Sequence, residues 1–135
     1  MTLRGFLVRF TLIYIGLLIV IGVSFTLLGA KSSTAGNAGA LIGAVMGTGL
    51  WFARANKRYF SPTEKRNAVL SMVAIDSGLQ TLVAAALLYG VPGGIGSKAM
   101  LFGVLFVSLL HALVIWYFVG WSGKQFAKEA AAKRT

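Results

Sequence analysis

The chain contains no cysteine, and only 3 of its 135 residues are acidic. The missing cysteines exclude disulfide scaffolds, thiolate metal sites, cysteine nucleophiles and redox pairs. Charged residues of both signs make up 12% of the sequence, about half the share usual in a soluble domain, whereas hydrophobic residues make up 57%. This composition excludes a soluble enzyme core and indicates that lipid surrounds the chain.

Long segments without charge, or with a single ionisable residue, predict membrane spans. A helix needs about 20 apolar residues to cross about 30 Å of hydrocarbon. Counted between the charged residues, the sequence predicts four spans, at about 7–29, 35–54, 67–90 and 99–122. We therefore expect an all-α integral membrane protein: a four-helix transmembrane bundle in a single domain over 1–135, with a basic tail at 123–135.

Lysine and arginine are distributed unequally between the two ends of the predicted spans. Of the 13 basic residues, only Lys31 and Lys98 lie on the side opposite the termini. Because cytoplasmic flanks retain Lys and Arg, we expect both termini in the cytoplasm, and Trp51, Trp116 and Trp121 fall near the same ends. This topology and attraction to anionic headgroups account for the basic charge. We expect no nucleic-acid partner, because no folded domain presents a groove-reading element.

The first span also has features of a signal peptide, since Arg4 and Arg9 precede the apolar stretch. That stretch is longer than the 7–15 residues of a typical signal core. Leu28 also interrupts the small-x-small cleavage pattern that would end at Ala30. We therefore expect the span to be retained.

Two local patterns predict helix ends. Ser61-Pro62-Thr63-Glu64 combines an N-cap serine, a proline at the first helical position and a glutamate three residues after the cap, which predicts a capping box before the third span. The cluster of glycine and proline at 90–94 predicts a turn between the third and fourth spans. Residues 31–37 are expected to form the loop between the first two.

Glycines recur at spacings of three and four residues in the second span. The stripe consists of Gly36, Gly39, Gly43 and Gly47. Lipid gives helices no hydrophobic reason to associate, so close packing across small residues becomes a main source of affinity. The stripe predicts a helix-packing surface, either against the other helices of this chain or against another protein.

Asp76 lies within the third predicted span, where a carboxylate costs about 2.5–3.5 kcal/mol on insertion scales. Counted inward from Asn67, it lies about 14 Å deep, and His111, counted back from Trp121, lies about 15 Å deep. The matching depths predict a hydrogen bond between the two in an intramembrane polar cluster. We expect Gln80 and Ser108, each one turn away, to support it. Other polar residues that could join are Ser77, Thr81 and Tyr14.

Two interpretations of this cluster stay open. Intramembrane ionisable groups often mark transport paths, so the cluster could be a proton or ion relay. It could instead be a structural pin that sets the register of the helices, each hydrogen bond contributing about 0.6 kcal/mol on average.

The residue types of a hydrolase triad are present in Ser108, His111 and Asp76, but the pattern does not indicate catalysis. A triad needs an exposed nucleophile and oxyanion donors, and no Gly-x-Ser-x-Gly turn occurs. One histidine without cysteine cannot supply the usual metal ligands. Glycine-rich nucleotide motifs in a strand–loop–helix context are also missing. We expect no enzyme activity and no catalytic, cofactor-binding or metal site.

The loop between the second and third spans carries a family resemblance. Its features are Trp51-Phe52-Ala53, the basic run to Arg58, and Ser61-Pro62-Thr63-Glu64-Lys65. With this loop and its span layout, the chain resembles a group of small, uncharacterised four-span inner-membrane proteins of proteobacteria. The resemblance implies a bacterial origin and an inner-membrane location, and it carries over no functional residue. The chain is less similar to the small multidrug exporters, because its first span has no membrane-embedded glutamate.

These features predict a non-enzymatic inner-membrane protein that acts through helix–helix contact with a membrane partner. It would be an accessory subunit or an immunity-type protector against a membrane-active toxin. The alternative is a small homo-oligomeric transporter or channel that uses Asp76 and His111 as an intramembrane proton or ion site. An enzyme acting on lipid ranks third, because no catalytic pair accompanies the basic surface.

Overall fold

The computed structural model describes residues 1–29, 34–89 and 98–132, and its regular structure within these ranges is helical. There are four helices: α1 (Leu3–Leu27), α2 (Thr34–Asn56), α3 (Pro62–Leu88) and α4 (Lys98–Ala132). Each is long and apolar enough to cross a membrane. The prediction of an all-α chain with four such helices is confirmed, while the turn predicted at 90–94 lies outside the described residues.

Two helices extend beyond the predicted spans. The capping box before α3 is present: the Ser61 hydroxyl accepts from the Glu64 amide at 3.3 Å, and the Glu64 carboxylate accepts from the Ser61 amide at 2.9 Å. α3 therefore begins at Pro62, ahead of the span expected from residue 67. α4 continues to Ala132, so the described part of the basic tail is helical.

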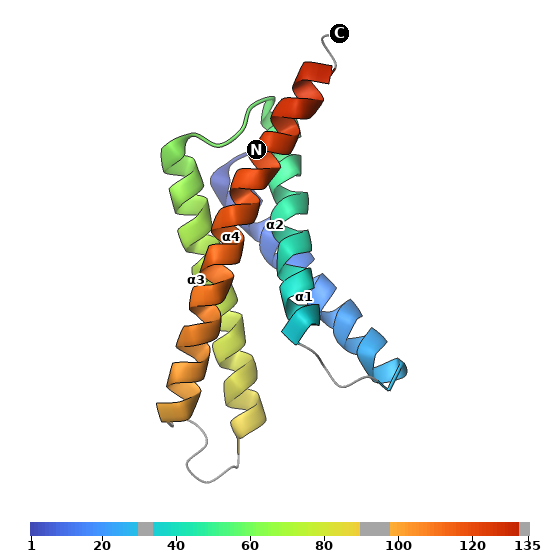
Figure 1. Cartoon of the computed structure of the whole chain (residues 1–135), viewed down its shortest axis with the longest axis vertical. Helices are drawn as coiled ribbons and strands as arrows, with labels where there is room; N and C mark the ends of the chain where they lie inside the picture. Colours follow the sequence, from blue (N-terminus) through green and yellow to red (C-terminus); the bar gives the residue numbers. More distant parts are fainter. Residues whose placement is uncertain (30–33, 90–97, 133–135) are drawn as a thin grey trace.

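The helices form a ring in the order α1, α2, α4, α3, and each packs against two neighbours. Among the described residues, the backbones of the diagonal pairs, α1 with α4 and α2 with α3, do not approach closely. Figure 1 shows the two termini and the connection from α2 to α3 toward one end of the molecule. We refer to this as the termini end, and to the other as the opposite end.

Aromatic side chains fill the core near the termini end. Phe6 of α1 and Phe52 of α2 pack with Phe60, which lies in the connection between α2 and α3. The Phe60 ring stacks on Phe52 at 4.0 Å between centroids and meets Phe6 edge-on at 5.1 Å. Aromatic pairs of this geometry contribute about 0.5–1.5 kcal/mol beyond the burial of their area. The connection is therefore anchored inside the bundle.

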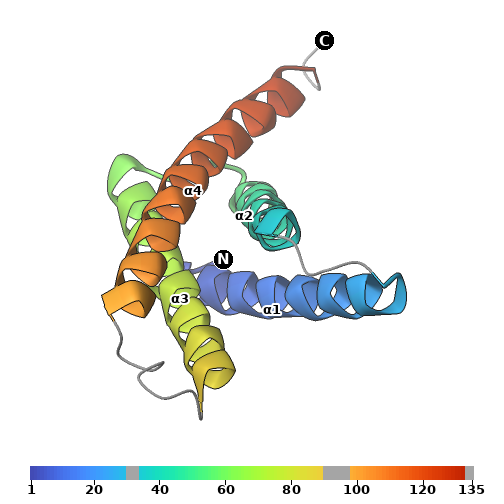
Figure 2. The same cartoon turned by 60° about the horizontal axis from the view of Figure 1, so that its bottom comes forward.

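Burial stops at one level on all four helices. In α1 and α3, which run away from the termini end, the last buried side chains are Tyr14 and Asp76. In α2 and α4, which run back toward it, the first buried side chains among the described residues are Ala40 and His111. Beyond this level α1 diverges from α3 and α4 (Figures 1 and 2). The bundle is thus packed in the half nearer the termini and open in the other half, where large apolar side chains such as Phe102 are exposed.

The connection at the termini end gives a pH prediction. The Tyr59 hydroxyl donates to the backbone carbonyl of Val119 in α4, and burial raises the pKa of Tyr59 to about 12. An unfolded tyrosine titrates near 10. The folded state therefore favours the protonated hydroxyl, and the stability that this group contributes is complete below pH 10 and is lost as the pH rises toward 12.

We expect the free energy of unfolding in mild detergent to fall across that pH window, as measured by thermal or denaturant unfolding. Tyr59→Phe removes the titrating group and should flatten this part of the profile. An unchanged decrease in Tyr59→Phe would assign the effect to other groups.

Candidate functional site

The strongest candidate site surrounds the carboxyl group of Asp76, a fully buried residue of α3. Oδ1 accepts a hydrogen bond from the Tyr14 hydroxyl of α1 at 2.6 Å. Oδ2 lies 2.5 Å from the amide nitrogen of Gln80 and 2.9 Å from Nδ1 of His111 on α4. Both oxygens are therefore occupied by hydrogen-bonding groups, as a buried carboxyl group requires.

The remaining helix, α2, contributes Asn37, whose Oδ1 lies 3.0 Å from the Tyr14 hydroxyl oxygen. A hydroxyl carries one proton, and the carboxyl group of Asp76 is both closer and the stronger acceptor. Because the two ends of an amide group are interchangeable by rotation, Asn37 can donate an N–H to the hydroxyl oxygen. All four helices thus meet in one hydrogen-bonded group, here named the polar cluster: Tyr14, Asn37, Asp76, Gln80 and His111.

Nδ1 of His111 has two neighbours, Oδ2 of Asp76 and the Gln80 nitrogen at 3.0 Å. If Nδ1 carries a proton, it donates to Asp76. If Nδ1 is bare, it accepts an N–H from Gln80 and the proton lies on Asp76. The amide of Gln80 has two hydrogens, so it can serve both atoms. The contacts therefore allow a proton to lie on either the carboxyl group or the imidazole.

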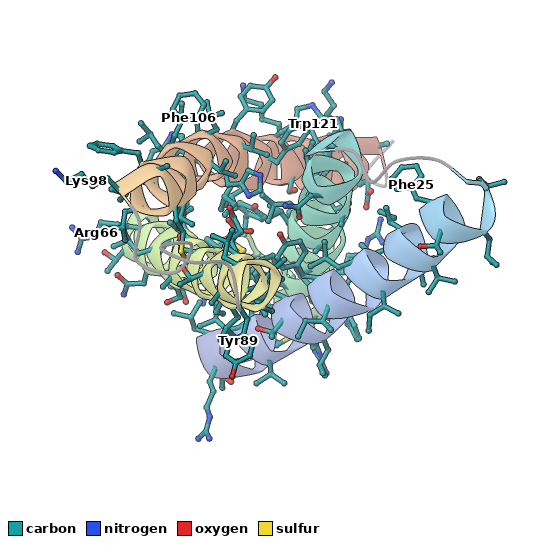
Figure 3. The ribbon with its side chains drawn as sticks, turned by 90° about the horizontal axis from the view of Figure 1, so that it is seen from below. Phe25, Arg66, Tyr89, Lys98, Phe106 and Trp121 are labelled. Atoms are coloured by element: carbon teal, nitrogen blue, oxygen red, sulfur yellow. The ribbon has the colours of Figure 1, made fainter. Side chains whose placement is uncertain are left out.

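The polar cluster is closed on one side and accessible on the other. One helical turn toward the termini end, each helix contributes a fully buried apolar side chain to a continuous layer: Phe10, Leu41, Met72 and Ile115. On the opposite side, Asn37 and Gln80 are only half-buried. Figure 3 shows the molecule from that opposite end, with Tyr89, Lys98 and Phe25 marking the separated ends of α3, α4 and α1.

Ser108 does not join the cluster as the sequence predicted. Its hydroxyl is buried and has no hydrogen-bond partner in the described part of the chain. It lines a shallow apolar groove of about 510 Å³ together with Val73 and Phe106. Three residues along a helix leave Ser108 rotated by about 60° from His111. The side-chain nitrogen of Gln80, and not the Ser108 hydroxyl, lies beside Nδ1 of His111, at 3.0 Å.

Of the other residues considered, Tyr14 is a member and Thr81 is not. The Thr81 hydroxyl is exposed and donates to the carbonyl of Ser77 in its own helix at 2.8 Å. Asn37 was missed because it was assigned to the loop at 31–37, whereas α2 already begins at Thr34. The sequence signal for Asn37 is its helical spacing from three apolar residues, Ala40, Leu41 and Ala44, and the structure shows that all three are buried.

The glycine stripe of α2 is used only in part within the chain. A Cβ atom built on Gly36 would lie 2.5 Å from Phe25 and 2.8 Å from Ile21, so α1 approaches closely there. A Cβ on Gly43 would meet Leu17 at 3.3 Å, whereas one on Gly39 or Gly47 would have no heavy atom of the described residues within 4 Å. Gly39, Gly43 and Gly47 are exposed and form what we call the glycine face.

Basic side chains stack on tryptophans between neighbouring helices near the termini end. The Arg9 guanidinium of α1 lies 4.2 Å from the ring centre of Trp51 on α2, and the Lys65 ammonium of α3 lies 4.5 Å from that of Trp116 on α4. Each contact contributes about 0.5–1 kcal/mol at an exposed site. Tryptophan side chains flanked by lysine or arginine are typical of the boundary between the hydrocarbon core and the lipid headgroups.

The described residues contain no group of three or more His, Cys, Asp and Glu side chains that could hold a metal ion. Asp76 and His111 are the only such residues of the polar cluster, and their contacts are directed at each other. No family model, curated protein or solved structure matches the chain.

Proposed function

We propose that this chain is a small non-enzymatic protein of a bacterial inner membrane that acts through helix–helix contact with a membrane partner. Depending on the partner, the chain acts as an accessory subunit of a membrane complex or as an immunity-type protector against a membrane-active toxin. Both termini lie in the cytoplasm in this proposal, because the basic residues and their tryptophan partners gather at the termini end.

The glycine face of α2 is the observation that carries this proposal. In a membrane, a helix surface without side chains lets another backbone approach closely, and this packing drives association. Gly39 and Gly47 have open space where a side chain would extend. The described side chains leave that space unfilled, and Gly39, Gly43 and Gly47 are exposed. A single transmembrane helix of another protein fits such a surface.

The test compares substitutions at open glycines. Gly47→Ile fills the glycine face, and Gly103→Ile adds the same side chain to α4; among the described residues, a Cβ atom at either position has no heavy atom within 4 Å. Affinity isolation from the native membrane in mild detergent should recover a stoichiometric partner with the unaltered chain and with Gly103→Ile. Recovery should fall at least tenfold with Gly47→Ile. Isolation of only a monomer or a symmetric homo-oligomer, or equal recovery with both variants, would contradict the proposal.

A second candidate is a small homo-oligomeric transporter or channel. The contact between Asp76 and His111 favours it, because this ionisable pair lies at the inner limit of the open half. In reconstituted vesicles, an imposed pH gradient should drive a flux that Asp76→Asn and His111→Gln each reduce at least tenfold. Ser77→Ala, beside the cluster but outside it, should keep the flux. Vesicles without flux above the lipid background would remove this candidate.

A further inference from the structure

We propose that the ligand of the polar cluster is a single proton, not a metal cation, and that it is exchanged through the opposite end of the bundle. The inference deepens the second candidate function, and it rests on that function only for its physiological use. Three properties of the cluster support the proposal: the oxygens of Asp76 already accept hydrogen bonds, the charges around Asp76 balance with one proton, and the two sides of the cluster differ in burial.

The hydrogen-bond donors leave little room for a metal ion. A divalent cation such as Mg²⁺ or Ca²⁺ needs about six or more oxygen ligands. Asp76 is the only carboxylate of the cluster, and Tyr14, Gln80 and His111 surround it with an O–H, an N–H and a ring nitrogen. A cation would have to displace these donors and would gain no second carboxylate. A proton needs only the 2.9 Å path from Oδ2 to Nδ1.

The net charge of the polar cluster favours the state with one proton shared by Asp76 and His111. The titratable groups that face Asp76 are Tyr14 from α1 and His111 from α4, whereas α2 and α3 supply the neutral amides of Asn37 and Gln80. With one proton shared between Asp76 and His111, the cluster is neutral. Removing it leaves a buried negative charge and adding another leaves a positive one, and either is costly in a low-dielectric interior. Proton release therefore requires water to reach the cluster.

Burial decides the route by which water arrives. The layer of Phe10, Leu41, Met72 and Ile115 separates the cluster from the termini end, and all four side chains are fully buried. Toward the opposite end, the half-buried amides of Asn37 and Gln80 are followed by helix segments with no buried side chain in their described parts. Separation of these segments would hydrate the cluster without opening the aromatic core.

The sequence allows a direct measurement at the site, because His111 is the single histidine. Chain labelled with ¹⁵N-histidine and placed in lipid nanodiscs should give one imidazole signal pair. We expect sodium, potassium, magnesium or calcium ions to change the apparent proton affinity reported by this pair less than twofold. Asp76→Asn should alter which ring nitrogen carries the proton, while Ser77→Ala should not. A metal-dependent shift larger than twofold would overturn the inference.

The route is tested with single cysteines, since the chain has none of its own. Ala84 and Ala68 lie eight residues after and before Asp76 in α3, and Ala84 is half-buried whereas Ala68 is fully buried. A membrane-impermeant thiol reagent applied from the opposite side should modify Ala84→Cys at least tenfold faster than Ala68→Cys. Faster modification of Ala68→Cys from the termini side would overturn the proposed route.

The outcomes separate this inference from the transport function. Vesicles without proton flux, combined with a metal-independent His111 signal and preferential labelling of Ala84→Cys, would remove the transporter and support the proton site. A sodium flux with a sodium-dependent His111 signal would support an ion site and overturn the proton assignment.

Discussion

Replacing Asp76 with alanine should lower the free energy of unfolding by about 2–4 kcal/mol. The change leaves Tyr14, Gln80 and His111 without the acceptor that they share. Hydrogen bonds between membrane helices contribute about 0.6 kcal/mol on average and up to about 1.7. A buried donor without an acceptor costs about 1–3 kcal/mol, although the surroundings relax in part. The cluster joins all four helices, so the loss should affect the whole bundle.

Unfolding by heat or by denaturing detergent in mixed micelles measures this effect. Asp76→Asn keeps the volume and one acceptor oxygen, so it should lose about half as much stability or less. Ser77→Ala, next in the helix and outside the cluster, should change stability by about 0.5 kcal/mol or less. If Asp76→Ala unfolds like the unaltered chain, the interpretation of the cluster as a structural pin is wrong. If Asp76→Asn stays stable but loses flux, a pin alone is insufficient.

Gly123→Ala should destabilise the termini end by about 1–3 kcal/mol, the range for overpacking a well-packed site. A Cβ atom at position 123 would lie 2.7 Å from Cε1 and 2.8 Å from Cδ1 of Tyr59. The ring has little freedom to move, because its hydroxyl donates to Val119 and its edge packs on Phe60 at 5.0 Å. Phe60 in turn is stacked on Phe52 in the aromatic core.

The matched control is Gly103→Ala in the same helix, where a Cβ atom would have no heavy atom within 4 Å in the part of the chain that the structure describes. Alanine favours a helix over glycine by up to about 1 kcal/mol, so this variant should be neutral or slightly more stable. A double-mutant cycle with Tyr59→Ala measures the coupling, because removing the ring should relieve most of the penalty of Gly123→Ala. Equal effects of the two glycine substitutions would show that the clash with Tyr59 is unimportant.

The contact between Asp76 and His111 was predictable because it depends mainly on depth. Two ionisable side chains at equal distance from the same end of antiparallel helices need only face each other to meet, and the structure places them 2.9 Å apart. Gln80 was predictable for the same reason, since it lies one turn from Asp76. The capping box at Ser61 depends on only four adjacent residues and was equally accessible to sequence reasoning.

Ser108 and Asn37 were assigned wrongly because their environment depends on how the helices rotate and cross. Spacing alone placed Ser108 beside His111, but the observed rotation of α4 directs it toward the apolar groove. Asn37 joins the cluster because α2 begins at Thr34 and brings this amide next to Tyr14 of α1. Neither the helix start nor the rotation follows from hydropathy.

The sequence by itself determined four long apolar helices and the local signals at their ends, because helix length and capping depend on neighbouring residues. The charge pattern led to the proposed topology on the same basis. Only the tertiary structure decided that burial ends at the level of Asp76 and that Gly39 and Gly47 stay uncovered. These features depend on the angles at which the helices cross. In helices that are apolar on most faces, many rotations about the helix axis bury a similar area. Close packing of side chains therefore determines which rotation is adopted.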